Sequence, residues 1–97
     1  MRRQYYVYMM ANKPYGTIYI GVTNDIVRRV LQHKNAKSGS FTGRYELARL
    51  VYYEVFDWVQ DAIEREKQLK SGSRRRKTDL IQAFNPTWRD LFDEIVD

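Results

Sequence analysis

The chain contains no cysteine, only two prolines and five glycines, and no long apolar run. Without cysteine it can form neither a disulfide framework nor a thiolate metal site. A membrane-spanning helix needs about 18 consecutive apolar residues, so nothing in this sequence is expected to cross a membrane. The start, MRRQYYVYMM, is short and tyrosine-rich and lacks a small-residue cleavage site, so it does not resemble a signal peptide. We therefore expect a cytoplasmic protein.

The length and composition of the chain suit one small domain whose charge is unevenly distributed. The 97 residues are 43% hydrophobic, which predicts a single folded domain over 1–97. The net charge of +5 divides into +7 for residues 1–50 and −2 for residues 51–97. A basic half that also holds tyrosines fits a polyanion such as nucleic acid. A soluble surface with an uneven distribution of charge explains the same totals. Charge alone does not distinguish this interpretation from nucleic-acid binding.

Alternation, helical spacing and turn residues predict three strands and four helices. The predicted strands are 4–10, 17–22 and 47–56. The predicted helices are 26–36, a segment capped by Asp57 that ends at 71–73, 74–84, and a last segment that begins with Asn85 as N-cap. The order ββαβααα, with the first two strands forming an antiparallel hairpin, predicts an α+β fold.

Three polar residues fall on or beside apolar helix faces. Glu66 continues the inward stripe of the second predicted helix, where a carboxylate must be paired, hydrated or bound to a metal. A structural explanation is that Glu66 lies at the edge of the stripe, in solvent or paired with Arg65 or Lys70. Arg29 and His33 lie four residues apart and share a helix face, where the arginine would keep the histidine neutral. A solvated helix face explains that pair equally well.

The strands of the hairpin carry tyrosines and one glycine. Tyr6 and Tyr8 share a face of the first strand, and Tyr19 faces away from the apolar side of the second. Tyrosines on strands usually pack with a hydrated hydroxyl. Gly21 would let a backbone or a phosphate approach the second strand closely.

Together these residues resemble the GIY-YIG nuclease domain. The pattern is YVY at 6–8, YIG at 19–21, Arg29 in the next helix and a glutamate on the helix after the third strand. The segments AIEREKQLK and NPTWRDL are similar to small stand-alone bacterial proteins of this family, which are described as like the N-terminal domain of an excision-repair endonuclease. The resemblance covers essentially the whole chain and implies a three-stranded antiparallel sheet flanked by helices.

The resemblance also implies an active site. The catalytic residues expected from it are Tyr8, Tyr19, Arg29, His33 and Glu66. Glu66 would hold one Mg²⁺ or Mn²⁺ ion, and Arg29 would neutralise charge on the phosphate. Tyr8 would position or deprotonate the attacking water, for which nearby cations must lower its pKa from about 10. A family asparagine corresponds loosely to Asn85, which a helix cap explains as well.

Two positions depart from the family pattern, and both affect the expected rate more than the fold. Tyr6 stands where the first motif normally opens with glycine, and Val22 follows YIG where some members carry lysine. Where that lysine helps to activate the tyrosine or the water, this chain must rely on His33, on the metal, or on no such group at all.

The implied function is metal-dependent hydrolysis of phosphodiester bonds in nucleic acid, DNA in particular. The similarity to an excision-repair endonuclease suggests DNA repair, and the sequence leaves other pathways open. The residues expected to contact nucleic acid are Gly21, Lys34, Lys37, Arg44, Arg74, Arg75, Arg76 and Lys77, although RRRK at 74–77 also suits a solvated helix start. The alternative is a non-catalytic nucleic-acid-binding module that keeps the fold. No membrane partner is expected, and monomer and weak dimer both fit the sequence.

Overall fold

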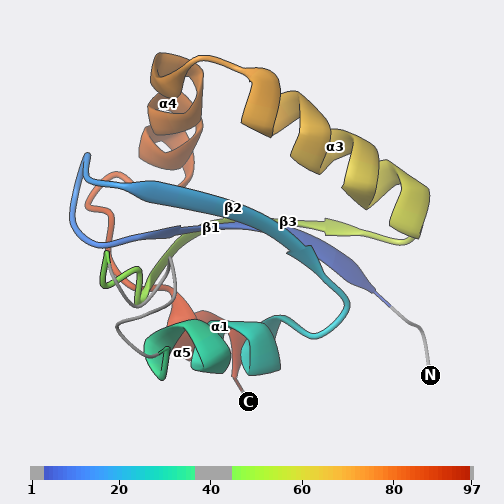
Figure 1. The fold of residues 1–97 in the computed structure, drawn as a ribbon, viewed down its shortest axis with the longest axis horizontal. Helices are drawn as coiled ribbons and strands as arrows, with labels where there is room; N and C mark the ends of the chain where they lie inside the picture. Colours follow the sequence, from blue (N-terminus) through green and yellow to red (C-terminus); the bar gives the residue numbers. More distant parts are fainter. Residues whose placement is uncertain (1–3, 37–44, 97) are drawn as a thin grey trace.

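A computed structural model describes residues 4–36 and 45–96 and shows a three-stranded antiparallel sheet with helices on both faces (Figure 1). The elements in chain order are β1 (Tyr5–Ala11), β2 (Ile18–Thr23), α1 (Ile26–Lys34), β3 (Arg49–Phe56), α3 (Val59–Ser71), α4 (Arg74–Phe84) and α5 (Phe92–Ile95). The strand order is β2-β1-β3, so β1 is central and β2 is an edge strand. The predicted α+β class and the order ββαβααα are confirmed. In the described ranges no helix is long and apolar enough to cross a bilayer.

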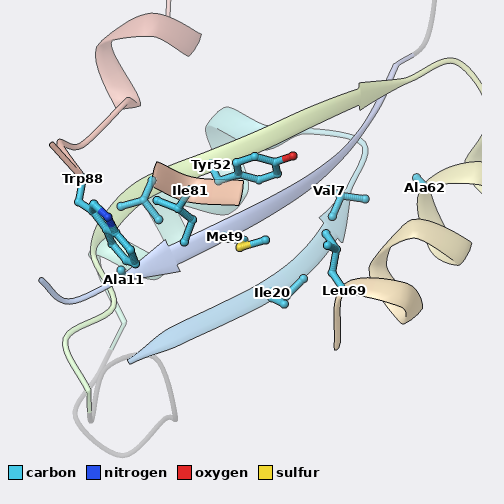
Figure 2. Packing of buried hydrophobic residues seen from close by; sticks show 10 residues of the cluster. Val7, Met9, Ala11, Ile20, Tyr52, Ala62, Leu69, Ile81 and Trp88 are labelled. Atoms are coloured by element: carbon cyan, nitrogen blue, oxygen red, sulfur yellow. The ribbon is translucent and has the colours of Figure 1, made fainter. Parts of the chain in front are cut away.

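Strand alternation sends the side chains of the sheet into two separate cores. Helices α3 and α4 cover one face, and α1 and α5 cover the other (Figure 1). The core beneath α3 and α4 contains Val7, Met9, Ala11, Ile20, Val51, Tyr52, Ala62, Leu69, Ile81 and Trp88 (Figure 2). The core beneath α1 and α5 contains Tyr8, Met10, Ile26, Val30, Leu47, Leu50 and Leu91. Because β1 is buried on both faces, it carries no charged residue.

A β-bulge interrupts the pairing of β1 with β3. Met9 pairs with Tyr52 while Met10 pairs with Leu50, so Val51 is the extra residue on β3. Val51 and Tyr52 consequently both pack into the core beneath α3 and α4, and beyond the bulge the alternation resumes.

Most helix boundaries follow the capping residues. The carboxylate of Asp25 accepts a hydrogen bond from the Arg28 N–H at 3.2 Å and caps α1, as the TND segment predicted. The helix 74–84 is confirmed, with Ser73 Oγ accepting from the Arg76 N–H. The prediction of Asp57 as the cap of α3 is wrong, because Trp58 occupies the N-cap position.

The prediction of a long last helix starting at Asn85 is also wrong. Asn85 ends α4, and its buried side-chain amide donates to the carbonyls of Val51 and Arg89. Trp88 has a positive φ of 55°, which interrupts any helix there. The predicted apolar stripe divides between the two faces of the sheet: Trp88 packs in one core, and Leu91 and Phe92 pack in the other. A single helix could not have covered both faces.

Candidate active site

A hydrogen bond between two buried side chains lies at the centre of the site. The Tyr8 hydroxyl, from β1, lies 2.9 Å from His33 Nε2 in the last turn of α1. Tyr8 is fully buried and His33 is 8% exposed. Because both groups are shielded from water, their proton positions depend mainly on each other and on neighbouring charges.

Tyr19 on β2 completes a cluster of three rings with Tyr8 and His33. Its ring centroid lies 6.3 Å from that of Tyr8 and 4.9 Å from that of His33. The strand pairing brings Tyr8 and Tyr19 to the face of the sheet that α1 covers, where His33 lies.

Arg29 lies one helical turn before His33 and connects this cluster to a surface pocket. Its guanidinium is close enough to Tyr8 to lower the pKa of the phenol by charge and by a hydrogen bond. The polar pocket, of about 220 Å³, is lined by Thr23, Asn24, Asp25, Arg28, Arg29 and Gln32. Two arginines in a polar pocket at the start of a helix favour an anion such as phosphate.

The burial of the cluster sets the protonation of its members. Burial, and next the neighbouring Tyr19, raise the pKa of Tyr8 well above its usual range, and the opposing effect of Arg29 is smaller. Arg29 thus acts in the direction that a role as base requires, but in the free protein its effect does not lower the pKa of Tyr8 overall. Burial, and then the charge of Arg29, lower the pKa of His33, which confirms that the histidine is neutral near pH 7.

Gly21 has a packing role that the motif did not reveal. It pairs directly with Tyr8 across the β1–β2 ladder, and a Cβ at position 21 would lie 2.5 Å from the Tyr8 hydroxyl oxygen. The ring of Tyr8 thus extends over the edge strand through the space that a side chain would fill. The predicted contact of Gly21 with nucleic acid stays a prediction, because close approach of Tyr8 already explains the glycine.

Glu66 is the predicted catalytic residue that is not part of this cluster. It lies on α3, which covers the opposite face of the sheet, and its carboxylate is 3.4 Å from Lys70 Nζ with 17% of the side chain exposed. The suggested pairing with Lys70 is confirmed, whereas Arg65 forms two hydrogen bonds with Glu54 instead.

Residues of the edge strand β2 contribute to the cores on both faces of the sheet. Glu66 falls between Ala62 and Leu69 of α3, and Leu69 lies beside Ile20 of β2 (Figure 2). Tyr8 reaches over Gly21, the residue next to Ile20, from the other face. Tyr8 therefore lies on one face of the sheet at β2, and Glu66 lies on the helix that covers the other face.

Glu66 is the residue that was predicted to hold a divalent cation, and in the structure its carboxylate pairs with Lys70. In residues 4–36 and 45–96 no group of three or more histidine, aspartate or glutamate side chains could hold a metal ion. A single half-buried carboxylate such as Glu66 suits Mg²⁺, which keeps several waters and takes phosphate oxygens as further ligands.

The predicted phosphate-contacting cations differ in their partners and in their exposure. Lys34 forms an ion pair with Asp90, and Arg74 donates to the carbonyls of Tyr15 and Gly16 at 2.6 Å each. Both charges already have partners within the protein, and the contacts of Lys34 and Arg74 with nucleic acid stay predictions. Arg75 and Arg76 are exposed and Lys77 is half-buried at the start of α4. Lys37 and Arg44 lie outside the described residues.

Sequence reasoning missed two residues that the structure places in or near the site. Arg28 lines the polar pocket beside Arg29, and the adjacent RR in the helix was the available signal. Asp90 contacts the end of α1 from 56 residues away, and no local pattern could have revealed this contact.

The chain belongs to the GIY-YIG family: residues 4–79 match the GIY-YIG catalytic domain. It is thus a member of a nuclease superfamily whose enzymes act on nucleic acid.

Similar proteins carry the name UPF0213. The UPF0213 protein SSP2268 of Staphylococcus saprophyticus is 35% identical over 80% of this chain and 94% of its own length. The UPF0213 protein HQ_3675A of Haloquadratum walsbyi is 32% identical over 84% of this chain and 91% of its own length. The solution NMR structure of the UPF0213 protein BH0048 from Bacillus halodurans is 28% identical, with a TM-score of 0.56 over 97% of this chain and 99% of that one.

Proposed function

We propose that the protein is a metal-dependent endonuclease that hydrolyses phosphodiester bonds of nucleic acid, DNA in particular, and takes part in DNA repair. The observation that carries the proposal is the 2.9 Å hydrogen bond between Tyr8 and a neutral His33 beside the arginine pocket. Because its raised pKa keeps Tyr8 protonated near neutral pH, the phenol can take up a water proton only if His33 accepts the proton that Tyr8 already carries.

The pair provides a route for the proton of the attacking water. As the water oxygen forms its bond to phosphorus, the Tyr8 oxygen accepts the water proton and passes its own proton to His33 Nε2. The bond from phosphorus to the leaving oxygen breaks, the leaving oxygen takes a proton from solvent, and His33 later returns the proton it accepted to solvent. Tyr8 thereby remains neutral overall, which agrees with its buried environment.

The remaining groups act on charge and orientation. Arg29 would donate to the non-bridging phosphate oxygens as negative charge develops on them, with Arg28 adding positive charge to the same pocket. Tyr19, packed against His33, would hold the imidazole and orient the phosphate. Glu66 would hold the cation, and a divalent ion bound there would neutralise phosphate charge and stabilise the leaving oxygen.

The decisive experiment is cleavage of labelled single-stranded, duplex, flap and branched DNA and RNA with Mg²⁺, Mn²⁺ or EDTA. We expect metal-dependent cutting that Glu66→Ala and Arg29→Ala each reduce by about 10²–10³-fold or more. Glu64→Ala is the matched control, because Glu64 is an exposed carboxylate on the same helix. Salt-sensitive binding without cutting by the unmodified protein would refute the nuclease and support the non-catalytic binding module.

A further inference from the structure

A short C-terminal segment packs against the catalytic helix although it lies beyond the matched domain. The family match ends at residue 79, yet Leu91, Phe92 and Ile95 pack in the same core as Tyr8. The N–H of Leu91 also donates to the carbonyl of Leu50 at 2.8 Å, so the segment is fixed to the start of β3. Residues outside the matched domain thus share a hydrophobic core with a residue of the candidate active site.

The carboxylate of Asp90 joins three elements of the structure. Oδ1 accepts hydrogen bonds from the N–H groups of Leu50 and Phe92, each at 3.1 Å. Oδ2 forms an ion pair with the Lys34 ammonium. One side chain therefore connects the start of β3, the start of α5 and the last residue of α1.

Lys34 is held at several points as well. Its Nζ donates to the carbonyl of Ala48 at 2.7 Å and lies 5.3 Å from the centroid of the Phe92 ring. Its side chain is 26% exposed. An ammonium with these partners fixes the end of the helix much more firmly than a solvated lysine would.

We propose that Asp90 is a positioning residue, which acts through Lys34 to hold the last turn of α1 so that His33 meets the Tyr8 hydroxyl. The inference rests on the proposed function, since it assigns catalytic importance to the contact between Tyr8 and His33. Helix α1 has only nine residues, and His33 directly precedes Lys34. Helix ends fray unless they are anchored, and a hydrogen bond of 2.9 Å is lost when the atoms separate beyond about 3.5 Å.

Two substitutions distinguish this role from phosphate binding by Lys34. Asp90→Asn keeps an oxygen for the N–H groups of Leu50 and Phe92 but removes the charge that holds Lys34. Lys34→Met removes the ammonium and keeps an apolar stem against Phe92. If Lys34 positions the helix, both substitutions impair catalysis in the same direction. If Lys34 binds phosphate, Lys34→Met weakens nucleic-acid binding, whereas Asp90→Asn releases the lysine and strengthens binding.

The experiment measures the site itself as well as turnover. His33 is the only histidine, so its imidazole signals in NMR titrations are assigned without ambiguity. We expect both substitutions to raise the pKa of His33 toward the ordinary value and to lower kcat by about 3–10-fold, with nucleic-acid affinity within twofold of the unmodified protein. The double substitution should be no worse than either single one, because both break the same contact.

Glu94→Gln is the matched control, because it removes the ion pair of Glu94 with Arg89 inside the same segment without touching α1. An unchanged His33 titration in both variants would overturn the proposal, as would opposite effects of the two variants on binding. If no condition gives cleavage, the proposed function fails, yet the His33 titration still decides whether Asp90 positions the helix.

Discussion

Replacing Gly21 by alanine tests whether the glycine leaves room for the ring of Tyr8 or for an approaching phosphate. The added Cβ would lie 2.5 Å from the Tyr8 hydroxyl oxygen, 2.6 Å from Cζ and 2.8 Å from Cε1. Favourable contacts between such atoms begin near about 3.5 Å, so the ring must move by roughly 1 Å. None of the described glycines has a positive φ, so backbone strain does not contribute.

The structure gives little room for that movement, because Tyr8 is fully buried. Overpacking of this kind costs about 1–3 kcal/mol. In a domain of this size each kcal/mol lowers the Tm by roughly 4–8 °C. A displacement of the Tyr8 hydroxyl by about 1 Å would also disturb its 2.9 Å hydrogen bond with His33, and a misplacement of this size costs roughly 10²-fold in rate.

Urea unfolding and cleavage kinetics of Gly21→Ala provide the assay. We expect lower stability by ~1–3 kcal/mol, a strongly reduced kcat and nearly unchanged nucleic-acid affinity. In a Tyr8→Ala background the cost in stability should largely disappear, because the clashing ring is gone. A stable Gly21→Ala variant that binds nucleic acid weakly would refute this reasoning and restore the phosphate-approach interpretation.

Two further predictions concern charge. The lowered pKa of His33 means that the folded state favours neutral imidazole, so this contribution to stability is present above pH about 6.5 and is lost as the pH falls below that value. Urea unfolding at pH 5–8 should show it as a difference between the unmodified protein and His33→Gln, and identical pH profiles would contradict it. At α4, Arg74→Ala should destabilise the fold by about 1–2 kcal/mol, because its guanidinium bonds two carbonyls of the β1–β2 turn. Arg76→Ala should instead leave stability within about 0.5 kcal/mol and reduce the log–log salt slope of binding by roughly 0.7–0.9, and equal stability effects of the two substitutions would refute the distinction.

Local sequence patterns predicted the helices and strands well where each pattern fits only one type of structure. The alternation in β2, the Asp25 cap of α1 and the extent of α4 all depend on neighbouring residues, and the structure agrees with them. The apolar spacing from Trp88 to Ile95 failed because it also suits a segment that crosses from one face of the sheet to the other. Periodicity shows which residues are buried but not which core receives them.

The sequence by itself determined the fold class, the GIY-YIG pattern and the residue types of the candidate site, because these depend on spacing along the chain. Only the tertiary structure decided three matters: the raised pKa of Tyr8, the space that Gly21 leaves for Tyr8, and the engagement of Lys34 by Asp90. Each depends on distances and burial between segments far apart in the chain. Such distances arise only when the two faces of the sheet are packed, so no local pattern could have supplied them.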